Sequence, residues 1–242
     1  VIPIKDEVDL IPVTLPSWYS LNPDEVVLCL DRPAPKNVVE SINEVASKLD
    51  AKEKTKVIEV ERNPSYKFHQ ANVRRWGFRE ARNDTILTGD IDTIVSSKLG
   101  GYLGLIGETV KLVSFSKLGF PPTFRNGVTW FIHMLYPHES FTGLYAFSKE
   151  AWLETENMKS LERIHRGEDT HLHEAIKRKY KTRFISGIKN LVLRPHESKK
   201  YQYLMGYNRW MIRKASIFRV ALSSVVYLRP HMFVGYLKAR LR

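Results

Sequence analysis

Short apolar runs alternate with helix-like segments through the first half of the chain. Four runs read as strands, at residues 11–15, 25–30, 56–60 and 85–87. The run at 25–30 is apolar throughout, as in a strand buried on both faces, whereas Pro12 assigns the first run to a sheet edge or to a strand's start. Helical spacing of apolar residues predicts two helices between the runs, at 37–49 and at about 66–82. This order predicts an α/β fold with a Rossmann-like, mostly parallel central sheet flanked by helices.

Helix and strand signals continue after residue 92 with less regular spacing. Further strands are expected at residues 111–115, 145–147 and 190–193, and helices at 126–136, near 150 and from 168. The first predicted helix has Asn37 at its expected N-cap and Glu40 three residues later, the pattern of a capping box. We expect one domain over residues 1–197 and a basic amphipathic helical tail over residues 198–242.

The tail accounts for most of the net positive charge. It has ten Lys and Arg and no Asp or Glu, in a chain whose net charge is +12. Such asymmetry indicates an anionic partner. Aromatic residues interleave with Arg209, Arg213 and Lys214, so the tail either packs on the core or docks on an anionic membrane surface. Nucleic acid is an unlikely partner, because it would leave the acidic residues described below unexplained.

Composition is that of an ordinary globular protein, with 43% hydrophobic and 26% charged residues. The lone cysteine, Cys29, lies in an apolar run and is expected in the core. The longest apolar runs are too short to span a bilayer, and the first residues lack the pattern of a signal peptide. We therefore expect a cytoplasmic protein, which the tail could attach peripherally to the cytoplasmic face of a membrane.

Two carboxylates follow the strand at 85–87. Asp90 and Asp92 are separated by one residue and would point the same way in an extended strand. Two like charges directed at one spot favour a cation between them, and oxygen ligands suit Mg²⁺ or Mn²⁺ bound to phosphate. The alternative is a surface turn. Asp31 ends the strand at 25–30, so it is expected at the same edge, where ligands bind in such sheets.

A second acidic pair, Glu168 and Asp169, opens the helix predicted from residue 168. Both lie one turn before Leu172, at the start of the helix's buried apolar stripe. The favourable interaction of an acid with the helix dipole explains one carboxylate on the solvent side, but it explains two on the inward edge less well. A carboxylate there could accept a proton from a sugar hydroxyl. His196 follows the strand at 190–193 and is a candidate near the metal, with an ordinary loop histidine as the alternative.

These blocks together resemble the family 2 glycosyltransferases. In that family an Arg-x-x-Gly-x-x-x-Ala helix leads into a strand bearing Asp-x-Asp, as Arg74, Gly77 and Ala81 precede Asp90-Ile91-Asp92 here. Residues 143–149 resemble the strand before the acceptor site, and residues 167–170 resemble the Glu-Asp motif. The order matches over roughly residues 10–197. The resemblance implies a glycosyltransferase A-type fold, a nucleotide-diphospho-sugar donor, a divalent Mn²⁺ or Mg²⁺ and usually inversion at the anomeric carbon.

The resemblance also implies roles on the donor side. Asp31 would contact the nucleotide base or ribose, although Arg32 stands where many members have a second acid. Arg74 would face the nucleotide, and Arg75 stands where the family often has Asn.

The resemblance also implies which residues bind the metal and which one accepts the proton of the acceptor hydroxyl. Asp92 would ligate the metal, and Asp90 would contact ribose or metal-bound water. His196 would lie near the metal or diphosphate. Asp169 would be the general base, with Glu168 as the substitute.

The sequence as a whole predicts a metal-dependent inverting glycosyltransferase. Its acceptor would be a hydroxyl of a glycan or a lipid-linked glycan. One alternative is a polyprenyl-phosphate sugar synthase, whose phosphate acceptor needs no general base. Another is a catalytically silent module that binds nucleotides or carbohydrates. The sugar, the nucleotide base and the acceptor stay open, because spacing along the chain does not define pocket shape.

Overall fold

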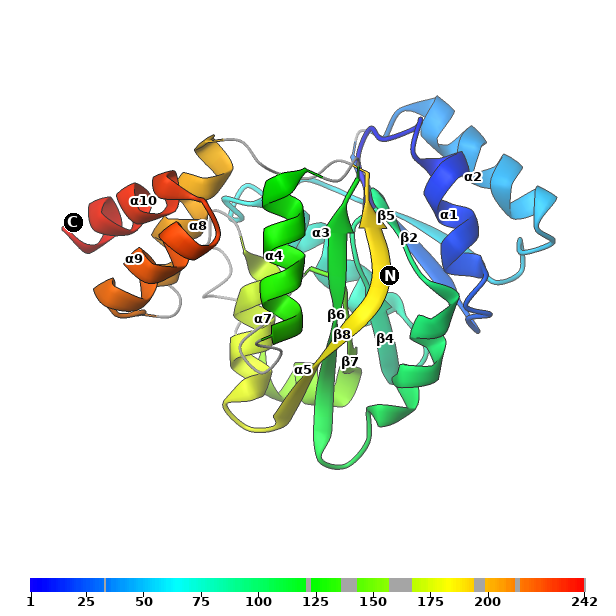
Figure 1. Ribbon diagram of the computed structural model, residues 1–242. Coiled ribbons are helices and arrows are strands. Elements are labelled where there is room, and N and C mark those ends of the chain that lie inside the picture. Colours follow the sequence, from blue (N-terminus) through cyan, green and yellow to red (C-terminus); the bar gives the residue numbers. More distant parts are fainter. Residues whose placement is uncertain are drawn as a thin grey trace.

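The computed structural model describes residues 1–32, 34–120, 123–135, 143–156, 167–193, 199–211 and 214–241. Strands form a three-stranded sheet in the order β1-β2-β3 and a five-stranded sheet in the order β4-β7-β6-β8-β5. Helices flank them, and a separate group of helices lies at one end of the molecule (Figure 1). The predicted α/β fold class is confirmed.

The first sheet is wholly parallel. Its strands are β1 (Ile2–Ile4), β2 (Val26–Asp31) and β3 (Thr55–Val60), and β2 pairs with both neighbours. Helices α1 (Ile11–Tyr19), α2 (Lys36–Lys48) and α3 (His69–Glu80) connect or follow these strands. Cys29 of β2 is fully buried, as expected. A β-carbon on Gly77 of α3 would lie 2.3 Å from the Cys29 sulfur, so glycine permits α3 to approach β2 this closely.

The strand expected at residues 11–15 is wrong, because this segment begins α1. Its buried residues are Ile11, Thr14, Leu15 and Trp18, which recur at helical spacing. Pro12 lies in the first turn, where its missing N–H removes no helical hydrogen bond. The first strand is instead residues 2–4.

The capping box expected at Asn37 is also wrong. Helix α2 already begins at Lys36, and its N-cap is Pro35, whose side chain makes no capping hydrogen bond. The helix buries Val38, Ile42 and Val45, which recur at helical spacing, whereas Leu49 at its C-cap is 43% exposed.

The second sheet is mixed. It contains β4 (Thr85–Thr88), β5 (Thr93–Ile94), β6 (Val110–Gly119), β7 (Tyr145–Ser148) and β8 (Lys181–Val192). Strands β6 and β8 run parallel, and the other three pairs are antiparallel. The backbone nitrogen of Val1 donates to the Leu87 carbonyl at 2.7 Å, which places the start of β1 beside β4. The helices of this half are η1 (Ser97–Leu105), α4 (Phe124–Leu135), α5 (Lys149–Thr155) and α7 (Glu168–Lys177).

The described residues of the tail form the helices α8 (Lys199–Met211), α9 (Ile217–Val226) and α10 (Pro230–Arg240). They pack chiefly on one another, away from α1 and α2 (Figure 1). Gly206 of α8 and Gly235 of α10 lie at the crossing of these two helices, where a β-carbon on either would meet the other helix's backbone within 2 Å. Within the described parts of the chain, none of the helices combines the length and apolar character needed to cross a bilayer.

Candidate active site

Asp90 and Asp92 lie in a turn between β4 and β5. The Thr93 N–H donates to the Asp90 carbonyl at 3.0 Å, so the strand geometry expected for this pair is wrong. The Trp18 indole N–H donates to the Thr93 carbonyl at 3.0 Å, and the Leu193 N–H donates to the Asp92 carbonyl at 2.8 Å. These bonds fix the turn between α1 and the end of β8.

Arg74 joins the two acidic pairs. Its side chain, on α3, is 2% exposed, and the two terminal nitrogens donate to different carboxylates. Nη2 donates to Asp90 Oδ1 at 2.5 Å, and Nη1 donates to Glu168 Oε1 at 2.8 Å. The guanidinium fork therefore holds the turn after β4 against the start of α7.

Burial and charge oppose each other at this contact. Burial disfavours the charge of Arg74, but Asp90 and Glu168 outweigh it and raise the pKa of the guanidinium. Burial also disfavours the charge of Glu168 and therefore raises its pKa, although the positive charge of Arg74 acts to lower that pKa. Arg74 thus keeps its charge, and Glu168 is a buried acid that depends on it.

The neighbouring Arg75 fixes α3 to other elements. It is 1% exposed, and its Nε donates to Glu156 Oε1 at 3.1 Å. Its Nη2 donates to the Glu168 carbonyl at 3.2 Å. Arg75 therefore ties the end of α5 and the start of α7 to the helix that carries Arg74.

Gly143, just before β7, marks the place where the acidic pairs meet. A β-carbon on this residue would lie 3.2 Å from Asp169 Oδ2, 3.4 Å from Lys117 Nζ and 3.8 Å from Asp90 Oδ2. We call Gly143, Asp169, Asp90 and Lys117 the Gly143 cluster. Because glycine has no side chain, the three charged tips surround a position that any other residue would occupy.

Both carboxylates of the cluster are oriented by hydrogen bonds that their Oδ1 atoms accept. Asp169 Oδ1 accepts from the Thr170 N–H at 2.7 Å, in the first turn of α7, which Gly167 enters with a φ of 85°. Asp90 Oδ1 accepts from Arg74 and, at 3.3 Å, from Gln70 Nε2. Each Oδ2 faces Gly143.

Asp31 lies at the end of β2, as expected, and has a partner that the sequence did not indicate. His69, the first residue of α3, places Nε2 3.1 Å from Asp31 Oδ1. Both side chains are largely buried. The two atoms lie within ion-pair distance but form no hydrogen bond. The role of Asp31 toward a nucleotide stays a prediction.

The structure thus brings Arg74, Asp90, Glu168 and Asp169 together. The role of Arg74 toward the nucleotide stays a prediction, but both of its terminal nitrogens bind carboxylates of this chain. His196 lies outside the described residues. The assigned roles of Asp92 and Asp169 likewise stay predictions.

The residues present fit a divalent metal in part. Among the described residues no group of three or more His, Cys, Asp or Glu side chains could hold an ion. Asp92 and Asp90 supply hard carboxylate oxygens in one turn, and Mg²⁺ or Mn²⁺ commonly takes its other ligands from water and substrate phosphates. This donor set suits an ion that binds together with a diphosphate.

Lys117 is the principal residue that the sequence analysis missed. It stands near the carboxyl end of β6, two residues beyond the strand predicted at 111–115. The rule that selected Asp31 and Asp90, a charged residue where a strand meets the ligand-binding edge, would have found it.

Several solved structures share this fold. The mannosyltransferase PcManGT from Pyrobaculum calidifontis, in complex with GDP-Man and Mn²⁺, matches with a TM-score of 0.66 and 17% identity, covering 98% of this chain and 72% of that one. Residues 1–349 of TarS from S. aureus match at 0.59 and 13% identity, covering 85% and 62%. Glucosyl-3-phosphoglycerate synthase from Mycobacterium tuberculosis, with Mg²⁺ and UDP, matches at 0.53 and 14% identity, covering 87% and 75%.

These likenesses establish the fold. The chain has the glycosyltransferase A-type fold that the motifs implied. No protein-family model and no curated protein sequence matches the chain. Membership of family 2 therefore stays a prediction.

Proposed function

We propose that this protein transfers a sugar from a nucleotide-diphospho-sugar to a hydroxyl acceptor, with a divalent metal and with inversion at the anomeric carbon. The observation that carries the proposal is the Gly143 cluster. The predicted base Asp169 and the predicted donor-site carboxylate Asp90 face one position from two different elements. PcManGT is solved with GDP-Man, residues 1–349 of TarS with UDP-GlcNAc, and glucosyl-3-phosphoglycerate synthase with UDP, and these ligands favour a nucleotide-sugar donor.

The chain's own residues would move the proton and orient the reactants. An acceptor hydroxyl at Gly143 gives its proton to Asp169 Oδ2 as its oxygen bonds to the anomeric carbon. The bond from that carbon to the diphosphate breaks, and its electron pair leaves with the diphosphate. The Thr170 N–H holds the other oxygen of Asp169. Arg74 holds Asp90 and Glu168 in place by paired charges.

Asp92 and Asp90 are the residues that would hold the metal. When bound, a divalent ion supplies positive charge that stabilises the diphosphate leaving group. Of the two carboxylates that face Gly143, Asp90 is bound by Arg74 and assigned to the metal, which leaves Asp169 as the base. With no carboxylate assigned as a nucleophile, inversion in one step is the expected course.

The first test is donor hydrolysis, with water as the acceptor. We expect release of nucleoside diphosphate from one member of a panel of nucleotide sugars in the presence of Mn²⁺. Asp92→Ala should abolish the metal-dependent turnover and leave the thermal unfolding midpoint unchanged, because the turn is held by backbone bonds. Glu108→Gln, at an exposed carboxylate after η1, is the control. Normal turnover by Asp92→Ala would overturn the metal assignment.

A second variant separates the hydroxyl acceptor from the alternatives. A phosphate acceptor is already ionised and needs no base, so a polyprenyl-phosphate sugar synthase would retain activity in Asp169→Asn. We expect this variant to lose about 10²-fold or more in kcat, the usual contribution of a positioned base. A silent binding module would bind a nucleotide sugar without releasing any product in the wild type.

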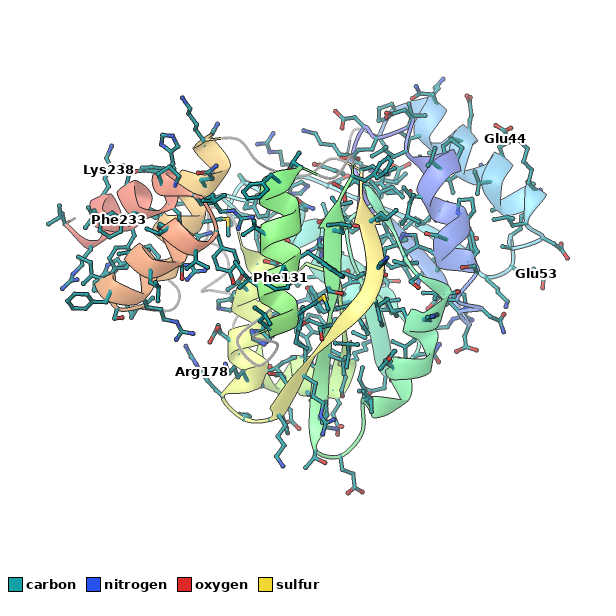
Figure 2. All side chains as sticks on the ribbon, in the orientation of Figure 1. Glu44, Glu53, Phe131, Arg178, Phe233 and Lys238 are labelled. Carbon is teal, nitrogen blue, oxygen red and sulfur yellow. The ribbon has the colours of Figure 1, made fainter. Side chains whose placement is uncertain are left out.

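We also propose that the tail docks on an anionic lipid surface. On α9, Phe218, Leu222 and Val225 are 83%, 66% and 72% exposed and recur on one helical face. Phe233 and Lys238 extend from α10 at the end of the molecule farthest from α1 and α2 (Figure 2). An exposed apolar stripe on a strongly basic element suits a bilayer with anionic headgroups. The protein would then lie in the cytoplasm, on the membrane face.

A further inference from the structure

Lys117 is held at the Gly143 cluster by an irregularity in the sheet. Strand β6 pairs with β8 at Phe115 opposite Ile185 and again at Lys117 opposite Asn190. Residues 186–189 of β8 therefore stand opposite Ser116 alone, so β8 contributes three extra residues at this step. Gly187 lies within them with a φ of 84°. Such bulges re-aim side chains beside active sites.

Buried polar contacts fix the backbone at this bulge. The Ser116 hydroxyl donates to the Ile188 carbonyl at 2.6 Å, and Asn190 Nδ2 donates to the Ser116 carbonyl at 2.9 Å. Asn190 Oδ1 in turn accepts from the Ser96 N–H at 2.9 Å. Both side chains are fully buried. The residue before Lys117 is therefore anchored on two sides, and Lys117 extends from a rigid element.

The ammonium of Lys117 is directed at the same position as the predicted base. Its Nζ and Asp169 Oδ2 lie 3.4 and 3.2 Å from the same position at Gly143. Within the described ranges, neither an ion pair nor a hydrogen bond is formed by this ammonium. Arg74, the other cation here, has both terminal nitrogens bound to carboxylates.

We propose that Lys117 binds an anionic group, a phosphate or carboxylate, on the acceptor, next to the hydroxyl that Asp169 deprotonates. The inference rests on the proposed function, because that function assigns the acceptor to Asp169. A hydroxyl placed at Asp169 Oδ2 brings its neighbouring substituents to Lys117 Nζ. An ammonium among carboxylates recognises an anion by charge and rejects a neutral analogue, which leaves it unpaired.

Binding of glycerol 3-phosphate, compared with glycerol, tests the proposal in the full chain by calorimetry. Glycerol 3-phosphate should bind and glycerol should not. Lys117→Met should weaken the binding about tenfold or more, as expected for loss of a charged hydrogen bond. Lys117→Arg should retain part of it. Lys189→Met, at an exposed lysine of the same bulge, should bind like the wild type.

Two outcomes would overturn the proposal. One is that the wild type and Lys117→Met bind glycerol 3-phosphate equally well, or that neither binds it. The other is a tenfold loss of nucleoside diphosphate binding in Lys117→Met with Mn²⁺, which would assign the lysine to the donor. Calorimetry measures binding without turnover, so the two proposals can fail independently. If no nucleotide sugar is hydrolysed, the proposed function is wrong, whereas the binding of glycerol 3-phosphate still reports on Lys117.

The anionic group could belong to a soluble acceptor or to a lipid, and inhibition of donor hydrolysis distinguishes the two. Each is represented by a pair of compounds, one with a phosphate and one neutral. Glycerol 3-phosphate and glycerol represent a soluble acceptor, and lysophosphatidic acid and monoacylglycerol in vesicles represent a lipid. Inhibition by the phosphate member of one pair, lost in Lys117→Met, identifies the source. Equal inhibition by the neutral members contradicts recognition of charge.

Discussion

At the scale of single residues, Arg74 determines whether the site holds together. It neutralises Glu168, which is 4% exposed, and orients Asp90 at the same time. Removing one partner of a buried ion pair leaves the other charge uncompensated. Arg74→Met should therefore lower the free energy of unfolding by about 3–5 kcal/mol, measured by urea denaturation.

A double variant separates the lost charge from lost packing. Arg74→Met with Glu168→Gln removes both charges, so part of the lost stability should return. If the double variant is as unstable as the sum of the single ones, the two side chains do not interact and the pairing described above is wrong.

The raised pKa of Glu168 gives the stability a pH dependence of known sign. Burial raises this pKa above the ordinary value of 4.5, so the folded state binds the proton more tightly than the unfolded state. Its contribution is fully present below the unfolded pKa and is lost as the pH rises through the higher folded pKa.

Glu168→Gln cannot titrate and should not show this loss. Its free energy of unfolding, relative to the wild type, should increase as the pH rises from about 4.5 through the folded pKa. Urea denaturation across this range measures the difference. Parallel pH profiles for the two proteins would show that Glu168 does not titrate differently on folding.

The sequence predicted which acidic residues gather, but not what orients them. Asp90, Glu168 and Asp169 were found because charged residues follow strands or open a helix at one edge. The fork of Arg74 and the anchoring of Lys117 depend on contacts between residues far apart in the chain. The place of Lys117 near the end of a strand could have indicated the residue, but the bulge of three extra residues in β8 that fixes its backbone leaves no periodic signal in the sequence.

At the scale of elements, the errors arose where two patterns overlap. Residues 11–15 contain a proline and alternate in a way that suits a short strand, yet Ile11, Leu15 and Trp18 also form one helical face. Tertiary burial of that face decides between the two. The strand β2 was predicted to within one residue, because an uninterrupted apolar run suits a strand buried on both faces. Of β6, only residues 111–115 were predicted.

The crossing of α8 and α10 depends on two glycines. A β-carbon on Gly206 would lie 1.7 Å from the Met232 carbonyl oxygen, and backbone cannot yield as a flexible side chain does. Gly206→Ala should therefore separate the helices and lower the unfolding midpoint of the tail. The aromatic pair Trp210 and Tyr236, with ring centroids 5.9 Å apart, gives a fluorescence signal for this.

Gly127→Ala is the matched control. Gly127 lies in α4 with open space around its β-carbon position, so alanine there should stabilise the helix by about 0.5–1 kcal/mol. If Gly206→Ala behaves in the same way, the close crossing is not required for the tail to fold.

At the scale of the whole molecule, charge and exposed apolar surface coincide on the tail. The proposed active site lies among the elements of the sheet and the helices that flank it, whereas α9 belongs to the separate helical group (Figure 1). Helix α9 exposes Phe218, Leu222 and Val225. Each Lys or Arg near an anionic surface adds about 1 kcal/mol of attraction, and burial of the apolar side chains adds to it. The intact protein should therefore float with vesicles that contain phosphatidylglycerol, and salt should weaken the binding.

Two double variants test whether this specific face makes the contact. Phe218→Ser with Leu222→Ser removes the stripe and should abolish flotation, while donor hydrolysis in solution stays unchanged because the reacting residues lie on other elements. Val13→Ser with Leu49→Ser removes two apolar side chains, 54% and 43% exposed, from α1 and from the end of α2, and should float like the wild type. Flotation that survives loss of the α9 stripe, or that needs no anionic lipid, would show that the tail does not dock in this way.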